Sequence, residues 1–135
     1  MATSLSAGLA VYDLLSADQY ISETVSTIFP VLIASDGDIR LPYICFNRER
    51  IDQVPTKVGY PGADTAQMAV AVYWDTDHYT DLIHLTEKVR EALDCKQYVM
   101  EPDGINMRSC YFTDAREYGD DEGHIVQELI FTIKM

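Results

Sequence analysis

Three polar residues in one predicted helix have the spacing of metal ligands. Asp77, Asp81 and His84 lie at positions i, i+4 and i+7, so a helix would present two carboxylate oxygens and one imidazole nitrogen on the same side. The sequence contains no further cluster of cysteine or histidine that would complete a coordination shell. We therefore interpret this face as a solvated helix surface, with Asp77 as the expected N-cap.

A second group of acidic residues follows at residues 119–123, where Asp120, Asp121 and Glu122 are consecutive. Paired carboxylates can act as acid and base in glycoside hydrolysis, but acidic residues are abundant in this chain and their spacing does not match a calcium loop. We interpret the group as a solvated acidic turn.

No motif for covalent or cofactor chemistry is present. A nucleophilic Ser, Cys or Thr needs an oriented base beside it, and none of the three histidines occurs in such a motif. The chain also contains neither a dinucleotide fingerprint nor a phosphate-binding loop. The sequence thus predicts no catalytic, cofactor-binding or metal-binding residues, and it favours a structural or binding role over an enzymatic one.

Size and charge limit the possible partners. The chain has 135 residues with 47% hydrophobic side chains, which predicts a single domain over residues 1–135 with an ordinary core. Its net charge of -12 repels phosphate, so we expect neither sequence-specific nucleic-acid binding nor docking on an anionic membrane.

The cysteines and the first residues of the chain indicate its compartment. Cys45, Cys95 and Cys110 are odd in number and far apart, which is typical of a reducing environment. The first basic residue is Arg40, so the charged region of a secretory signal is missing. We expect a soluble cytoplasmic protein.

The most strongly patterned stretch is residues 66–94. Residues 66–76, AQMAVAVYWDT, alternate with apolar side chains on both faces, which predicts a central strand. The helix that follows has one apolar stripe, made of Leu82, Leu85, Val89 and Leu93.

Weaker patterns complete the fold. A short helix is predicted at residues 5–15, and residues 27–33 are an edge strand at most because Pro30 has no amide to donate. Residues 41–51 predict a half-exposed strand with Ile44 and Phe46 inward, whereas Tyr43, Cys45, Asn47 and Glu49 point outward. Residues 105–119 and 124–135 predict two long strands of a hairpin, and residues 52–65 form a long loop. The predicted fold class is α+β, with a mostly antiparallel sheet of about four to five strands and two helices packed on one face.

Several short sequence segments occur in the same order as in a known protein family. The opening helix contains VYDLLSAD, and TIFPV places Phe29 and Pro30 where that family has an aromatic-proline pair. LPYICFNR, AQMAVAVYWDT and TDLIHLTEKVREAL follow, and then two terminal strands. The chain thereby resembles the tail completion or tail terminator proteins, the minor tail protein U-like head-tail joining proteins of long-tailed bacteriophages and prophages. Residues 52–65 and 96–104 depart from the family pattern.

This resemblance implies a non-enzymatic subunit of the phage or prophage virion. It would form a homo-oligomeric ring, expected to be a hexamer, that caps the tail tube, ends its polymerisation and provides the head-joining surface. Its implied partners are further copies of itself, the tail tube protein and a head-completion protein, and it would be found in the host cytoplasm during assembly and then in the virion tail.

Residues can be assigned to such a ring from their chemistry. The subunit contacts are expected at Phe29 and Pro30 and in the long loop, at Val58, Tyr60 and Pro61. An acidic wall would let DNA slide through the ring without binding, and the lumen-facing candidates are Asp120, Asp121 and Glu122.

Two other functions remain compatible with the sequence. One is a small α+β ligand-binding or enzymatic domain with a site between helix and sheet, which would use His84 or the acidic turn. The other is an adaptor that dimerises through a sheet edge.

Overall fold

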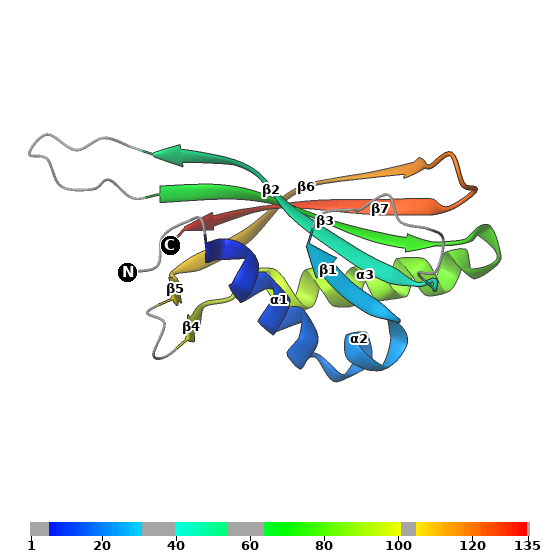
Figure 1. Cartoon of the computed structure of the whole chain (residues 1–135), viewed down its shortest axis with the longest axis horizontal. Helices are drawn as coiled ribbons and strands as arrows, with labels where there is room; N and C mark the ends of the chain where they lie inside the picture. The colour runs from blue at the N-terminus through cyan, green and yellow to red at the C-terminus, as the bar shows by residue number, and fades with distance from the viewer. Residues whose placement is uncertain (1–5, 31–39, 54–63, 101–104, 135) are drawn as a thin grey trace, which may run out of the picture.

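A layer of helices covers one face of a five-stranded β-sheet (Figure 1). The computed structural model describes residues 6–30, 40–53, 64–100 and 105–134. The helices are α1 (Ala7–Ala17), α2 (Gln19–Thr24) and α3 (Tyr79–Leu93), with a short 3-10 turn, η2 (Thr76–His78), before α3. Among the described residues, none of the helices combines the length and apolar character that a membrane crossing needs.

The sheet has the strand order β1-β2-β3-β7-β6. Its strands are β1 (Thr27–Pro30), β2 (Tyr43–Gln53), β3 (Asp64–Trp74), β6 (Ser109–Gly119) and β7 (Ile125–Lys134). Strand β1 pairs with β2 in parallel, whereas the other three pairings are antiparallel. The sheet is therefore mixed, and α+β describes the fold overall. The alternation of side chains is the same in parallel and antiparallel strands, which is why the sequence did not indicate this parallel edge.

The predicted central strand and helix stripe are confirmed. Strand β3 is the middle strand of the sheet, and its Met68, Val70 and Val72 pack in one cluster with the apolar stripe of α3. The four stripe residues, Leu82, Leu85, Val89 and Leu93, are all fully buried. Strand β1 (Thr27–Pro30) is an edge strand, as predicted.

A second buried cluster lies on the other face of the sheet, the face without helices. Tyr43 and Cys45 are only 6% and 5% exposed and pack with Ala71, Tyr73 and Val126. The prediction that Tyr43 and Cys45 belong to an exposed outward side is therefore wrong. The registers of the pairings place Tyr43, Tyr73 and Val126 side by side on neighbouring strands, so these side chains shield one another from water.

Two local predictions are also wrong. Asp75 and not Asp77 caps the turn before α3, because the Asp75 side chain accepts a hydrogen bond from the His78 amide at 3.1 Å. The long strand predicted at residues 105–119 is divided at Arg108 into β5 (Ile105–Met107) and β6. Strand β5 pairs with β4 (Tyr98–Met100) in a separate two-stranded sheet that the sequence did not indicate.

Candidate interaction surfaces

The residues predicted to contact neighbouring subunits are only partly described. Phe29 and Pro30 lie in β1 at one edge of the sheet. Phe29 is half-buried and packs on the Tyr43 ring, with 5.6 Å between the ring centroids, whereas Pro30 is exposed. Val58, Tyr60 and Pro61 lie outside the described residues. The described strands on either side of this loop, β2 and β3, pair with each other.

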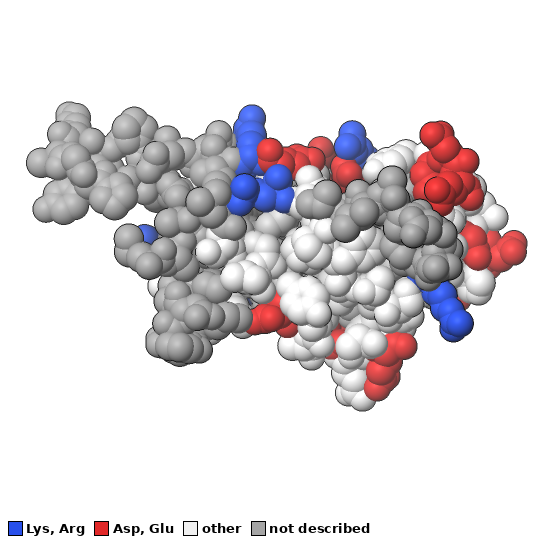
Figure 2. Space-filling view, viewed as in Figure 1, with Lys and Arg blue, Asp and Glu red and all other residues white. Residues whose placement is uncertain are grey.

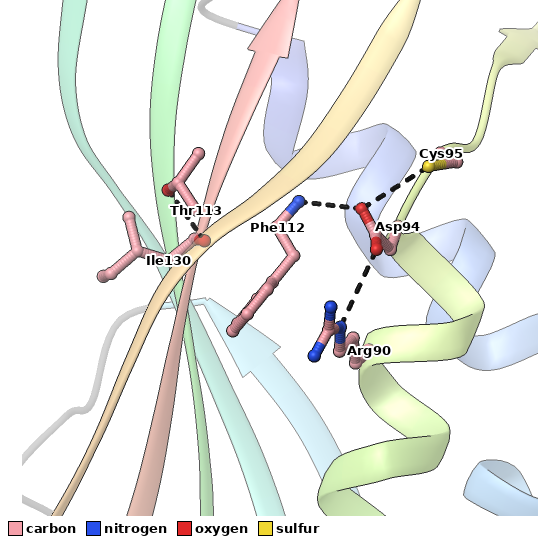
Figure 3. Close-up of polar contacts among 6 residues, drawn as sticks. All are labelled: Arg90, Asp94, Cys95, Phe112, Thr113 and Ile130. Carbon is pink, nitrogen blue, oxygen red and sulfur yellow. Dashed lines mark hydrogen bonds and ion pairs between the residues drawn. The ribbon is translucent and has the colours of Figure 1, made fainter.

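The opposite edge of the sheet, β6, is held against the end of α3 by Asp94 (Figure 3). The amide of Phe112 donates to Asp94 Oδ1 at 2.9 Å, and Arg90 Nε lies 3.7 Å from Asp94 Oδ2. The Arg90 guanidinium also stacks over the Phe112 ring at 4.1 Å from its centroid. The Cys110 carbonyl, two residues earlier, also points away from β7 and accepts from the Cys95 amide. By the two-residue alternation of a strand the Phe112 amide lies on the same outer side, where it can make this contact.

Other contacts further occupy the outer side of β6. The Cys95 amide donates to the Cys110 carbonyl at 2.7 Å, and Asp114 Oδ1 accepts from the Ala115 amide at 2.8 Å. Strand edges with unpaired backbone groups attract other strands. These contacts therefore protect the first half of β6 from simple strand addition.

The open face of the sheet has a shallow polar depression of about 510 Å³. Its walls include Glu49, Gln67, Asp114, Arg116 and Glu128. Glu128 is 8% exposed, and its Oε1 accepts from Arg116 Nε at 2.6 Å. Because Arg116 neutralises the buried Glu128 carboxylate, Glu128 is not available as an unpaired charge for a ligand in this depression.

Tyrosines dominate the apolar part of the same face. The rings of Tyr43 and Tyr73 stack with 4.6 Å between centroids. Burial, reinforced by the negative charges of Asp120 and Glu122, raises the pKa of Tyr43 to about 12. Burial likewise raises the pKa of the Cys45 thiol to about 11. These groups are neutral at physiological pH, and they act here as packing residues and not as nucleophiles.

The acidic turn between β6 and β7 is organised by one of its own carboxylates. Asp120 Oδ1 accepts from the amides of Glu122 and His124 at 2.9 and 2.8 Å, and Asp120 Oδ2 lies 2.9 Å from His124 Nδ1. Burial opposes ionisation of Asp120, but these amides and His124 hold its pKa below the ordinary value. Asp121 and Glu122 are exposed. Of the three acidic residues predicted to face a lumen, Asp120 is therefore the one whose hydrogen bonds hold the turn together.

The residues whose possible ligand atoms cluster in the structure are not those that the helical spacing suggested. Among the described residues, ligand atoms of Asp120, Glu122 and His124 lie within 4.8 Å of one another, whereas Asp77, Asp81 and His84 do not form such a group. The local hydrogen bonds account for Asp120 and His124 without an ion. His84 packs edge-on against Tyr20, with 5.1 Å between the ring centroids.

Charge is distributed unevenly over the surface. Figure 2 shows acidic side chains gathered at the end where β6 turns into β7, basic side chains over β2, and a largely uncharged area over α1 and β1. Two exposed apolar residues lie on α1, Leu9 at 54% and Tyr12 at 43% exposure, and two tyrosines are exposed on β6, Tyr111 at 49% and Tyr118 at 39%. Sequence patterns missed these surface residues because exposure depends on the tertiary packing.

Comparison with known proteins shows the fold. A scan against protein-family models found no match, and a search of curated proteins found none either. Among solved structures, the chain is similar to a chain from a structure described as the virion of a native gene transfer agent particle. The two share 15% sequence identity at a TM-score of 0.71, over 92% of this chain and 90% of the other. At this identity the likeness establishes a common fold over nearly the whole length of both chains.

Proposed function

We propose that this protein is a structural component of a virion and, more specifically, a tail terminator. Copies of the chain form a ring, expected to contain six subunits, that caps the tail tube, ends its polymerisation and provides the surface on which the head docks. The protein acts without catalysis, together with a tail tube protein and a head-completion protein. It assembles in the host cytoplasm and remains in the tail of the phage or of the prophage-derived particle.

The observation that supports this proposal most is the fold similarity to a chain of a virion, which extends over 92% of this chain. This similarity is one of structure, with 15% of the aligned residues identical, whereas the resemblance to tail terminator proteins comes from short sequence segments. Two different kinds of comparison thus lead to virion proteins.

The interior of the protein supports a structural role over the alternative of a small enzyme. The alternative requires a cavity between the helices and the sheet. That space is filled by fully buried side chains, the largest being Phe131, Leu15 and Ile21. The described depressions lie on the surface and have mainly charged and polar walls. Flat surfaces and a filled core are what a ring subunit needs.

The net charge of -12 supports passage of DNA through such a ring. A polyanion in an acidic channel is repelled from the wall, so it does not bind tightly. Of the residues predicted to face the lumen, Asp120 is engaged in hydrogen bonds. Asp121 and Glu122 are exposed and remain available to face either a lumen or a neighbouring subunit.

The proposal is tested by the oligomeric state and by the phenotype of a deletion. Size-exclusion chromatography with light scattering should give a mass several times the 15.3 kDa of the chain, and negative-stain electron microscopy should show rings with a central hole. In cells that produce the particle, loss of the gene should give tail tubes of irregular, excessive length. A protein that stays monomeric at high concentration, together with tails of normal length in the deletion strain, would contradict the proposal.

A further inference from the structure

We infer that the ring, if formed as proposed above, is held together by contacts between the two opposite edges of the sheet in neighbouring copies of the chain. A basic edge, defined by Arg40 before β2 and by Arg48 in β2, meets an acidic edge of the next copy, defined by Asp114 in β6 and by Asp121 in the turn that follows. The contact is head-to-tail, so each copy uses both edges.

The basic edge is unusual in a chain with 22 acidic and only 10 basic residues. Arg40 and Arg48 are both exposed. Strand β1 covers β2 only from Tyr43 to Phe46, so Arg48 lies just beyond the part of β2 that β1 pairs with. Tyr12 of α1 packs near Phe46 at a centroid distance of 6.4 Å, which places the exposed apolar surface of α1 beside this edge.

The acidic edge is formed by the other boundary of the sheet. Asp114 and Asp121 are exposed, and the nearby cation Arg116 is already paired with Glu128 at 2.6 Å. Tyr111 and Tyr118 are exposed along the same strand. Each edge thus combines exposed apolar or aromatic side chains with an excess of charge of one sign, although Glu49 stands beside Arg48 and Arg116 lies on β6. Protein interfaces likewise combine an apolar core with a polar rim.

The strand registers place the opposite charges at matching levels. Arg48 pairs with Met68, which pairs with Phe131, and Phe131 pairs with Phe112 just before the bulge that leads to Asp114. Arg48 and Asp114 therefore lie within about one row of each other on opposite edges, Arg48 on the face of Met68 and Asp114 on the face of Ile130.

The second pair of opposite charges, Arg40 and Asp121, can be located from another row of paired residues in the sheet. The row of Tyr43 runs through Tyr73 and Val126 to Tyr118. Arg40 precedes Tyr43 by three residues, and Asp121 follows Tyr118 by three residues. Because β2 and β6 run in opposite directions, both displacements lead to the same end of the sheet. A neighbour placed edge to edge would therefore bring both pairs of charges to matching levels along the contact, where the long Arg48 side chain reaches around the edge toward Asp114.

The charge pattern identifies a second copy of the chain as the occupant of each edge. A two-fold contact would oppose each edge to itself and bring like charges together, whereas a head-to-tail contact joins unlike charges. The contact also does not depend on strand addition along the first half of β6, which Asp94 and Asp114 obstruct. We expect side chains to make most of the interface.

Two charge-reversal variants test this arrangement. The first, Arg40→Glu with Arg48→Glu, makes the basic edge acidic. The second, Asp114→Lys with Asp121→Lys, makes the acidic edge basic. Each variant alone should elute as a monomer under conditions in which the wild-type protein forms rings. An equimolar mixture should assemble again, because each edge of one variant then meets an edge of opposite charge in the other.

A matched control separates this effect from a change in net charge. Glu87→Lys with Glu91→Lys on the exposed side of α3 shifts the net charge by the same amount as the acidic-edge variant, and it should leave the ring intact. Far-ultraviolet circular dichroism and thermal unfolding of every variant verify that the monomers are folded. Restored assembly in the mixture gives the same assurance, since unfolded chains would not combine into rings.

The outcomes distinguish the interface from the proposed function. Wild-type protein that never assembles contradicts both the ring and this interface. If the wild-type protein forms rings and either variant does so too, the ring stands and the edges are not its contacts. Persistence of the ring in the Asp114→Lys, Asp121→Lys variant is also the result expected if Asp121 faces the lumen. Variants that dissociate but fail to assemble when mixed would show that the two edges do not contact each other.

Discussion

Removal of the Asp94 carboxylate is the sharpest test of how the sheet edge is held. The substitution Asp94→Ala deletes the acceptor for the Phe112 amide at 2.9 Å and the ion-pair partner of Arg90 at 3.7 Å (Figure 3). A hydrogen bond to a charged group contributes about 1.5–3 kcal/mol to stability. The ion pair adds under about 1 kcal/mol, because exposed pairs contribute little and the Arg90 side chain is 53% exposed.

One effect of the substitution is favourable. Asp94 is the C-cap of α3, where a negative charge opposes the helix dipole, and its removal recovers about 0.5 kcal/mol. The sum of these contributions is a loss of about 2 kcal/mol in the free energy of unfolding. Asp94→Asn should cost roughly half as much, because the amide oxygen still accepts from Phe112 but the charge is lost.

The free energy of unfolding of both variants can be measured by urea unfolding, monitored by the fluorescence of Trp74, the single tryptophan. Glu91→Ala is the matched control, because Glu91 lies on the exposed side of the same helix, 3.7 Å from Lys88 in an exposed pair. It should change stability by less than about 0.5 kcal/mol. If Asp94→Ala were as stable as Glu91→Ala, Asp94 would not hold the β6 edge.

Other perturbations follow from the core, the tyrosines and the acidic turn. Leu85→Ala should cost about 3 kcal/mol in urea unfolding because it empties a fully buried site, whereas Glu87→Ala on the exposed side of α3 should be nearly neutral. Because the pKa of Tyr43 is raised from 10.0 to about 12, its contribution to stability is complete below pH 10.0 and is lost as the pH rises toward that folded value. Tyr43→Phe should therefore flatten the alkaline part of a stability-against-pH curve, and an unchanged slope would contradict the assignment. The pKa of Asp120 is lowered, so its contribution is present above its ordinary pKa and is lost as the pH falls through the folded value. Asp120→Asn should reduce acid sensitivity in the same assay, and equal acid midpoints would show that the turn does not depend on this charge.

Short-range periodicity was sufficient to predict the helix and the central strand. The stripe of α3 repeats every three or four residues, and its members are buried together because one side of a helix faces the sheet. Strand β3 is apolar on both faces, which is typical of a strand with neighbours on both sides. The predicted hairpin of the last two strands is confirmed as β6 and β7. These features depend on residues that are close in the chain.

The features that the sequence did not indicate depend on residues that are far apart. Tyr43 is buried because the register places Tyr73 next to it, and a period of two does not show which strands are neighbours. Asp94 meets the Phe112 amide only because the end of α3 lies against β6, 18 residues further along the chain. For the candidate site, the sequence correctly placed Phe29 and Pro30 in an edge strand, but it did not single out Arg40, Arg48 or Asp114, whose place at the sheet edges follows from the strand order.

The two edges also limit how a chain of this charge can assemble. A net charge of -12 makes every copy repel every other copy at long range, and this repulsion is screened beyond roughly 8–10 Å at physiological salt. Attraction must therefore come from short-range contacts between surfaces of opposite sign. In the proposed ring, the basic edge at Arg40 and Arg48 is such a surface for the acidic edge of another copy, and the contact between them would be directional. A directional contact repeats around an axis and either closes into a ring or continues as a filament. Because the sheet twists, its two edges are not parallel, and the angle between them gives each added copy a rotation, which is the geometric requirement for closure.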